Sequence, residues 1–411
     1  MNAPPVLHLF EGFGLELEYM LVHRETLAVF PWADELLRLT ARTDGYVQDV
    51  ARGPVAWSNE LVCHVLELKT NGPASSLGGL DRVFHEDVAH INGLLAGRGA
   101  MLLGTGAHPL MDPATDTRLW SHGDRQIYSA YDRIFGCRGH GWSNLQSTHL
   151  NLPFCGDEEF GRLHAAVRLV LPLIPALAAS SPLLDGQPTG YLDSRLETYR
   201  HNQARIPSIA GRIIPERLFT RGEYDTLFER LRTDVAPHDP DGILEPVFLN
   251  SRGAIARFDR NAIEIRLLDI QECPQADLAV AAAVVSATRH LVDETHVPVE
   301  VQQEWPEDLL SDILLAGIRD GDAAVIRDAD YLRMFGIRAG ACSAGQAWRN
   351  ICENCRDDFD DRQKAALGHI LSAGPLARRV LRSLGARPSR EVIVSVYRDL
   401  GGCLADNRLF G

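Results

Sequence analysis

Four short segments of the sequence place acidic, imidazole or guanidinium side chains two residues apart. They read GLELE at 14–18, ELK at 67–69, HLN at 149–151 and EIR at 264–266. In a β-strand, residues i and i+2 lie on the same face, so each segment would have one polar and one apolar face. Carboxylates with an occasional imidazole bind Mg²⁺ or Mn²⁺, and the planar fork of arginine binds phosphate or carboxylate. The segments predict a cation site beside an anion site, provided that the four strands share one sheet.

The same pattern also fits an antiparallel sheet whose outer face is simply exposed to water. Such a face usually mixes Thr, Lys, Ser and Glu. The pairs His149-x-Asn151 and Glu264-x-Arg266 are less typical of it. The pattern alone leaves both interpretations open.

The apolar periodicity predicts the elements that would position these side chains. Predicted strands cover 12–22, 61–69, 100–106 and 146–152, with two strands or one bent strand over 254–268. Predicted helices cover 77–95, 163–179 (interrupted by Pro172 and Pro175) and 276–292, and the chain after about 300 is mostly helical. Strands and helices do not alternate regularly, which favours an α+β fold with an antiparallel sheet.

Composition limits the classes of function. The chain has 411 residues, with 41 Lys and Arg against 55 Asp and Glu, so its formal charge is −14. This acid excess argues against nucleic-acid partners. No apolar run approaches the roughly 20 residues of a membrane span, and the first residues do not resemble a secretory signal. We therefore expect a cytoplasmic protein without membrane or nucleic-acid partners.

The eight cysteines form no disulfide framework and are expected to be reduced thiols. Cys352 and Cys355 form a single C-x-x-C pair. Because no second Cys or His pair lies nearby in the sequence, the pair on its own does not predict a zinc or redox site.

Five segments in this order carry a resemblance to a known family: FGLELEY, VLELKTNGP, STHLNLPF, ALAASSPLLDGQPTGYLDSR and AIEIRLLD. Together they resemble the glutamate–cysteine ligase family, on the branch that includes bacterial carboxylate-amine ligases. The resemblance implies a glutamine-synthetase-like catalytic fold, in which a curved antiparallel sheet forms a funnel flanked by helices. It also implies a single catalytic domain over 1–411, with the core sheet and motifs at about 8–295 and a helical part at about 296–411.

Members of the family use ATP and Mg²⁺ (or Mn²⁺) to convert a carboxylate, typically the γ-carboxylate of glutamate, into an acyl phosphate that an amine attacks. The resemblance therefore implies small-molecule amino acid and amine substrates, and a homodimer is plausible by resemblance alone. A phosphotransferase of the same fold superfamily, or a binding protein that has lost turnover, are the alternatives.

The resemblance assigns roles to matching positions. Arg266 would lie near the transferring phosphate and, with Asn151, near the nucleotide. Ser194 and Arg195 would lie near the substrate, with Arg195 also assisting catalysis. Apart from the resemblance, Arg200 belongs to a polar run after Arg195, which fits either a loop that closes over the substrate or, more simply, a solvated loop. The implied metal ligands are Glu16, Glu18, Glu67, His149 and Glu264.

One position departs from the family pattern. Many relatives have a second carboxylate four residues before the position of Glu67, where this chain has Cys63. Glu60 or His64 could compensate, although His64 should face away from Glu67 in a regular strand. The number of metal ions therefore stays open at this point.

Overall fold

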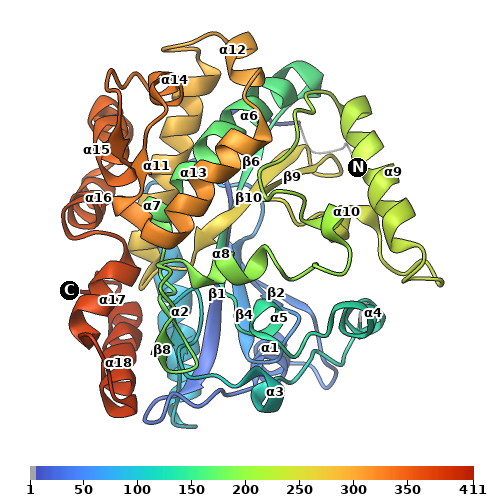
Figure 1. The fold of residues 1–411 in the computed structure, drawn as a ribbon. Helices are drawn as coiled ribbons and strands as arrows, with labels where there is room; N and C mark the ends of the chain where they lie inside the picture. The colour runs from blue at the N-terminus through green and yellow to red at the C-terminus, as the bar shows by residue number, and fades with distance from the viewer. Residues whose placement is uncertain (1–5, 124) are drawn as a thin grey trace.

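The computed structural model describes residues 6–123 and 125–411. Residues 1–5 lie outside the described residues, so the structure does not test the expectation that the first residues form no secretory signal. A single eight-stranded sheet forms the centre of the molecule, in the order β2-β3-β4-β1-β6-β10-β9, with β5 pairing with β1 (Figure 1). All pairings in this sheet are antiparallel. Its strands are β1 (Gly14–His23), β2 (Asp49–Arg52), β3 (Val55–Asn59), β4 (Val65–Thr70), β5 (Ala100–Leu103), β6 (Ser147–Pro153), β9 (Ala254–Arg257) and β10 (Ala262–Asp269).

The longest strand, β1, holds the sheet together because it pairs with three neighbours, β4, β5 and β6. It can approach β6 closely because it begins with Gly14, which lies opposite Asn151. A Cβ atom at Gly14 would stand 2.9 Å from the Cβ of Asn151. This glycine therefore leaves room for the polar side chain of Asn151 on the outer face.

The apolar face of the sheet packs into the main core. Leu15, Leu17 and Tyr19 of β1 are fully buried, and they share one hydrophobic cluster with three long helices. These are α2 (Leu80–Ala96), α6 (Gly156–Val170) and α11 (Pro274–Val292). Helix α11 begins with proline and is otherwise rich in Ala and Val, a composition that suits a buried helix packed on several sides.

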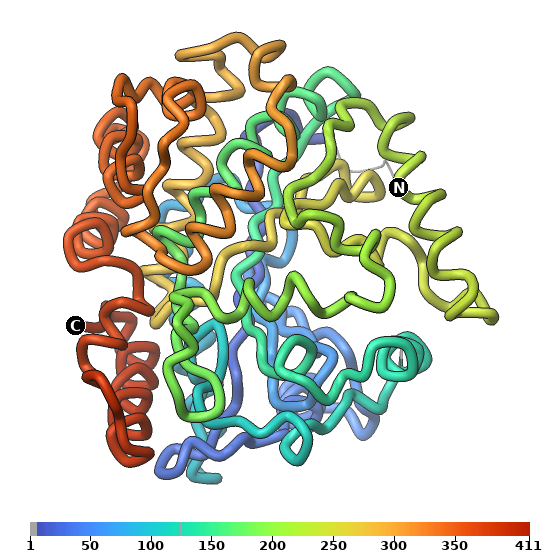
Figure 2. Tube along the Cα trace, in the orientation of Figure 1, coloured from blue at the N-terminus to red at the C-terminus, as the bar shows by residue number. Residues whose placement is uncertain are grey.

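The C-terminal part is helical, as the periodicity predicts, and it lies along one side of the molecule (Figures 1 and 2). Helix α16 packs mainly on α11, and α18 packs on α2 and β5. Side-chain N-caps at Asp328, Ser343, Asp360 and Ser389 start four of the C-terminal helices. The helices of the C-terminal part are α12 (Val299–Gln303), α13 (Glu307–Asp320), α14 (Ala329–Met334), α15 (Ala344–Asn354), α16 (Asp361–Ala373), α17 (Leu376–Leu384) and α18 (Arg390–Asp406).

Three helices lie on the opposite side of the molecule from α15–α18 (Figure 1): α4 (Arg125–Phe135), α9 (Arg221–Val235) and α10 (Pro246–Leu249). Helix α8 (Ser194–Tyr199) lies between the two sides and contacts α13. Of the helices in the described residues, none combines the length and the apolar character that crossing a membrane requires. The remaining short elements are α1 (Ala33–Ala41), α3 (Pro113–Asp116), α5 (His140–Ser143), η1 (Leu171–Leu173), α7 (Pro175–Ala178), β7 (Leu183–Leu184), β8 (Gln187–Pro188), η2 (Pro207–Ile209), η3 (Gly321–Ala323), β11 (Val325–Ile326), β12 (Cys342–Ser343) and η4 (Arg356–Asp358).

The structure confirms the predicted strands and the antiparallel sheet, and it decides between the two alternatives for 254–268. That segment forms a hairpin of two strands, β9 and β10. The helix predicted over 163–179 begins earlier, at Gly156, and changes to a 3₁₀ turn at 171–173, where Pro172 cannot donate a helical hydrogen bond. The sequence reasoning missed the hairpin β2–β3, whose strands are short and whose turn contains Gly53 with φ of 68°.

Candidate active site

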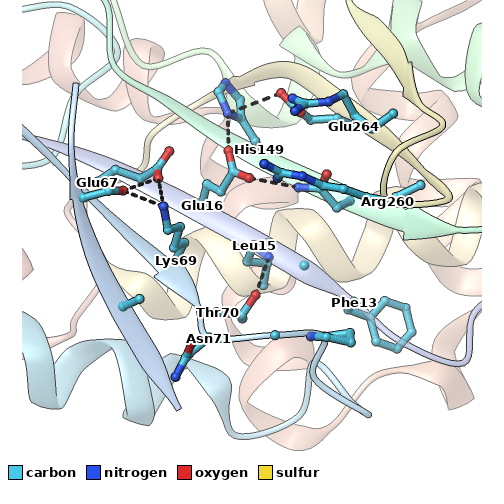
Figure 3. A pocket seen from close by; sticks show the side chains of 18 of the residues that line it. Phe13, Leu15, Glu16, Glu67, Lys69, Thr70, Asn71, His149, Arg260 and Glu264 are labelled. Atoms are coloured by element: carbon cyan, nitrogen blue, oxygen red, sulfur yellow. Dashed lines mark hydrogen bonds and ion pairs between the residues drawn. The ribbon is translucent and has the colours of Figure 1, made fainter. Parts of the chain in front are cut away.

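The strand register brings the polar side chains of four strands onto one surface. Glu16 of β1 lies between Lys69 of β4 and His149 of β6 in the register. One step along, Glu18 is paired with Glu67, and Ser58 of β3 is paired with Glu67 from the other side. The polar face predicted from the i, i+2 spacing is therefore continuous across the sheet (Figure 3).

Two groups on this surface could each hold a metal ion. One consists of Glu16, Glu67 and His149, and the other of Glu18, Glu60 and Glu67. Within each group, one ligand atom per residue lies within 4.8 Å of the others. Oxygen donors with one imidazole suit Mg²⁺ or Mn²⁺. Because Glu67 belongs to both groups, the geometry fits two neighbouring cations that share one carboxylate.

Both ring nitrogens of His149 have partners. Nδ1 lies 2.8 Å from Oε2 of Glu16, and Nε2 lies 2.9 Å from Oγ of Ser147. Burial acts to raise the pKa of Glu16, but the hydrogen bond and charge of His149 outweigh it and lower that pKa to about 2. Conversely, Glu16 and Glu18 overcome the effects of burial and of Arg266, and they raise the pKa of His149. Positive charge is thus favoured at the centre of the carboxylates.

Two further carboxyl groups of the cluster, Glu67 and Glu60, are pushed towards their protonated forms. Burial, followed by the charge of Glu16, raises the pKa of Glu67 to about 7. Burial and the charge of Glu18 raise the pKa of Glu60 well above its ordinary value. Like charges crowded out of water cannot all ionise at low cost unless a cation joins them.

We expect Mg²⁺ to stabilise the protein more at about pH 8 than at about pH 6. The raised pKa of Glu67 stabilises the folded protein below the ordinary carboxyl pKa, and this contribution is lost as pH rises through about 7. A bound cation needs the ionised carboxylate, so proton competition weakens its binding at the lower pH. The measurement is the difference in Tm between samples with Mg²⁺ and with EDTA across this range. An equal difference in Glu67→Gln and wild-type protein would contradict the assignment.

Relatives have a carboxylate at the position of Cys63, and in this chain the carboxylate of nearby Glu60 lies at the cluster instead. The Cys63 thiol is buried and points to the carbonyl oxygen of Leu119, at 3.6 Å. His64 is also buried, with Nε2 2.7 Å from the carbonyl oxygen of Ser143. Of the two candidates for compensation, the structure brings Glu60 to the cluster and turns His64 away, as its strand position predicts.

We expect Glu60→Gln to weaken Mg²⁺ binding at least about tenfold, because the second group then loses one of its charged oxygens. Cys63→Ser, three residues away, should leave Mg²⁺ binding within about twofold, since its side chain does not reach the cluster. Isothermal titration of Mg²⁺ compares the two variants. A larger loss of Mg²⁺ affinity in Cys63→Ser than in Glu60→Gln would contradict the assignment of Glu60 to the second cation group.

Two arginines hold the buried carboxylate of Glu264 from opposite oxygens. Arg257 Nη1 donates to Oε2 at 3.1 Å, and Arg266 Nη1 donates to Oε1. His149 Nδ1 stands 3.9 Å from Oε1. The structure thus places Glu264 at the edge of the cation groups and beside fixed positive charge. Sequence reasoning missed Arg257, although its place at the end of a predicted strand two positions from Ile255 was a usable signal.

Two cavities meet at this cluster. The larger, of about 1080 Å³, is lined by β1 to β4, by Asn151 and by the turn between β9 and β10. The smaller, of about 420 Å³, is lined by residues from α4, α5, α8 and α10. The residues common to both are Glu18, Glu60, Tyr128, His149, Phe248, Arg257 and Arg266. Glu18, Glu60 and the two arginines therefore stand at the junction of two spaces, whereas Glu16, Glu67 and Glu264 line the larger cavity alone.

The predicted substrate residues fall in different places. Arg195 lines the smaller cavity, and its guanidinium donates to Oδ1 of Asp269 at 3.3 Å and to the carbonyl oxygen of Arg266 at 2.7 Å. Ser194 is buried and shares a hydrogen bond with Thr189 at 2.6 Å. Arg200 pairs with Glu197 at 2.8 Å. Within the described residues, neither Ser194 nor Arg200 lines either cavity, so the substrate roles expected of them stay predictions.

The fold has a counterpart among solved structures. The crystal structure of glutamate–cysteine ligase from Francisella tularensis in complex with AMP matches this chain with a TM-score of 0.58 and 12% identity. The match covers 98% of this chain and 90% of that one. At this identity the likeness shows the fold alone, and it confirms the predicted α+β class with a curved antiparallel sheet of the glutamine-synthetase-like type.

Sequence comparison adds relatives that match more closely. A protein from Archaeoglobus fulgidus is 31% identical over 97% of this chain and 99% of its own length. A protein from Rubrobacter xylanophilus that bears the name "Putative glutamate--cysteine ligase 2-3" is 28% identical, over 56% of this chain and 61% of its own. The family model of glutamate-cysteine ligase family 2 (GCS2) matches residues 12–398. The chain therefore belongs to glutamate-cysteine ligase family 2.

Proposed function

We propose that the protein is an ATP- and Mg²⁺-dependent (or Mn²⁺-dependent) ligase that joins the side-chain carboxylate of glutamate to an amine. The observation that carries the proposal is the pair of donor groups that share Glu67 and reach, through Glu18, Glu60 and His149, the junction of two cavities where Arg257 and Arg266 also lie. Divalent cations bound there would align the triphosphate and neutralise its charge. Arginine at the same junction would stabilise charge on the transferring phosphoryl group.

The proposed reaction has two chemical steps. A carboxylate oxygen of glutamate takes the γ-phosphoryl group of ATP, which leaves ADP and an acyl phosphate. The amine nitrogen then attacks the acyl carbon, the C–O bond to phosphate breaks, and the nitrogen loses a proton. The products are an amide, ADP and inorganic phosphate. The protein's own contribution is to hold the reacting groups in line and to exclude water.

The larger cavity suits the nucleotide. Its volume of about 1080 Å³ lies at the upper end of ordinary ligand sites, and Lys69, Asn151 and Arg260 line it. The solved Francisella ligase of the same fold was crystallised with AMP, which supports an adenine nucleotide here. We therefore assign the larger cavity to ATP.

The smaller cavity suits the acid and the amine. Among its lining residues, four buried polar atoms have no hydrogen-bond partner within the described residues, namely Nε of Arg257, Nε of Arg266, Nε1 of Trp142 and Oε1 of Gln203. Buried polar atoms normally have partners, so these atoms are suited to a bound polar substrate. The N–H groups of Arg266 and Trp142 would donate hydrogen bonds to a carboxylate.

The wall of the smaller cavity also indicates the class of amine. Apolar side chains from α4, α5 and α10 gather there, and Tyr131, Phe135 and Trp142 form an aromatic cluster with ring centroids 5.3 to 5.9 Å apart. The lining members are Ile127, Tyr131, Trp142, Val247 and Phe248. An apolar wall binds an apolar body better than a small polar one. We therefore propose an amine with an aliphatic or aromatic body as the acceptor.

The test is ADP release with glutamate, ATP and Mg²⁺ against a panel of amines, with mass spectrometry of the products. The panel pairs each apolar amine with a polar one of similar size and includes cysteine and ammonia. The proposal expects a product with the mass of acid plus amine minus water, formed fastest with apolar amines. A phosphorylated substrate without amide would instead indicate a phosphotransferase. ATP binding without ADP release would indicate a binding protein.

A further inference from the structure

A second cluster of metal-ligating side chains lies outside the two cavities. Helix α11 ends near His290, and there it meets the C-terminal end of α15 and the 3₁₀ turn η4. Nε2 of His290 stands 3.5 Å from Sγ of Cys355. His290, Cys355 and Asp358 each offer a ligand atom within 4.8 Å of the others. None of these three residues lines either of the two cavities of the candidate active site, so the cluster is separate from the groups proposed for catalysis.

The donors of the cluster suit a zinc site. Zinc binds thiolate sulfur at about 2.3 Å and imidazole nitrogen at about 2.0 to 2.1 Å, so two such ligands at a tetrahedral angle stand about 3.6 Å apart. Sγ of Cys355 stands 3.5 Å from Nε2 and 3.6 Å from Nδ1 of His290, so the two groups are close enough to share one ion once the ring turns one nitrogen towards it. A mixed set of sulfur, nitrogen and oxygen donors also favours zinc over Mg²⁺, which prefers oxygen alone.

A small hollow adjoins the cluster and has room for a single ion. Its volume is about 10 Å³, and His290, His296 and Cys355 are among the residues that line it. This volume corresponds to about one water-sized sphere, which excludes an organic ligand. The imidazole of His296 is held against the backbone at Gly336, where a Cβ atom would stand 2.5 Å from the ring. His296 therefore closes one side of the hollow.

A neighbouring side chain fixes the carboxylate. Ser286, one turn before His290 on α11, donates a hydrogen bond to Oδ2 of Asp358. This contact leaves the other oxygen of Asp358 for a metal ion, as outer partners of metal ligands commonly do. Within the described residues only three groups meet the same geometric condition, and the other two are the cation groups of the active site.

We infer that His290, Cys355 and Asp358 bind one Zn²⁺ ion per chain. The ion would fasten the end of α15 to α11. It thereby ties the C-terminal helices to the helix that packs on the catalytic sheet. The C-x-x-C pair supplies only Cys355 to this site, and the histidine partner lies 65 residues earlier in the chain.

The experiment is a titration of reduced, EDTA-treated full-length protein with Co²⁺ in excess Mg²⁺, which occupies the carboxylate groups of the active site. We expect a thiolate-to-cobalt charge-transfer band that saturates at one ion per chain and disappears on addition of Zn²⁺. His290→Gln and Cys355→Ser should lose the band and bind Zn²⁺ at least about tenfold more weakly. Cys342→Ser is the matched control, because Cys342 is a half-buried cysteine outside the cluster.

The Co²⁺ titration of wild-type protein tests the zinc site even if a variant fails to fold. Absence of a thiolate band at stoichiometric Co²⁺ would overturn the inference, as would a band that is unchanged in Cys355→Ser. A band that disappears in Cys342→Ser instead would place the site at another thiol and overturn it as well. Because the readout is spectroscopic, the result does not depend on whether the proposed ligase activity is found.

Discussion

Glu67→Gln is expected to reduce ATP-dependent amide formation by at least about a hundredfold. Glu67 is the carboxylate common to both cation groups, so its loss removes a charged ligand from two ions at once. The loss of a single preorganised electrostatic group typically costs a factor of 10² to 10³ in rate. The substitution preserves shape, and the hydrogen bond from Ser58 to Oε1, at 2.6 Å, can form with the amide oxygen. The fold should therefore survive.

The control for Glu67→Gln is the same chemical change at an exposed position, Glu300→Gln on α12. The control should retain wild-type turnover and wild-type stabilisation by Mg²⁺. In Glu67→Gln, stabilisation by Mg²⁺ should fall together with turnover. A folded Glu67→Gln protein with near-normal turnover would show that the shared carboxylate holds no catalytic cation.

Arg266→Met is expected to lower kcat by about 10² to 10³ while leaving the response to Mg²⁺ intact. Arg266 lines both cavities and lies beside Glu264. Its removal does not leave Glu264 unpaired, because Arg257 still donates to the other oxygen at 3.1 Å. Arg266→Lys should recover part of the rate, since lysine keeps the charge but lacks the planar fork.

Steady-state kinetics and thermal shift together separate the two variants. Glu67→Gln is expected to lose both turnover and stabilisation by Mg²⁺. Arg266→Met is expected to lose turnover and to keep stabilisation by Mg²⁺. Arg338→Met, at an exposed position in the C-terminal part, is the control for the arginine change. Wild-type kcat in Arg266→Met would remove this residue from the reaction.

The polar face of the sheet could be predicted from the sequence because it depends only on strand periodicity. Glu16 and Glu18 must share a face with each other, as must Glu264 and Arg266, whatever the strands pair with. The register between strands was not available from periodicity. Which carboxylate stands opposite Glu67 depends on hairpins and long connections, and the sequence pattern does not fix these.

Residues outside the strands were harder to place. Glu60 lies in the loop before β4, where the chain leaves the regular alternation, so no spacing rule connects it with Glu67. His290 and Cys355 come together only because α11 and α15 pack on each other. Ser194 and Arg200 were expected near the substrate, Ser194 by resemblance and Arg200 from its polar run. Their side chains make local hydrogen bonds to Thr189 and Glu197, and their substrate roles stay predictions.

The division of the active site into two spaces affects the order of events during turnover. Nucleotide in the larger cavity would leave the smaller one accessible, so the amine can arrive while ADP is still in place. Initial-rate plots for the three substrates should then intersect, as in a sequential mechanism, and should not run parallel as in a ping-pong mechanism. Such an arrangement shields the short-lived phosphorylated acid from hydrolysis until its acceptor is beside it.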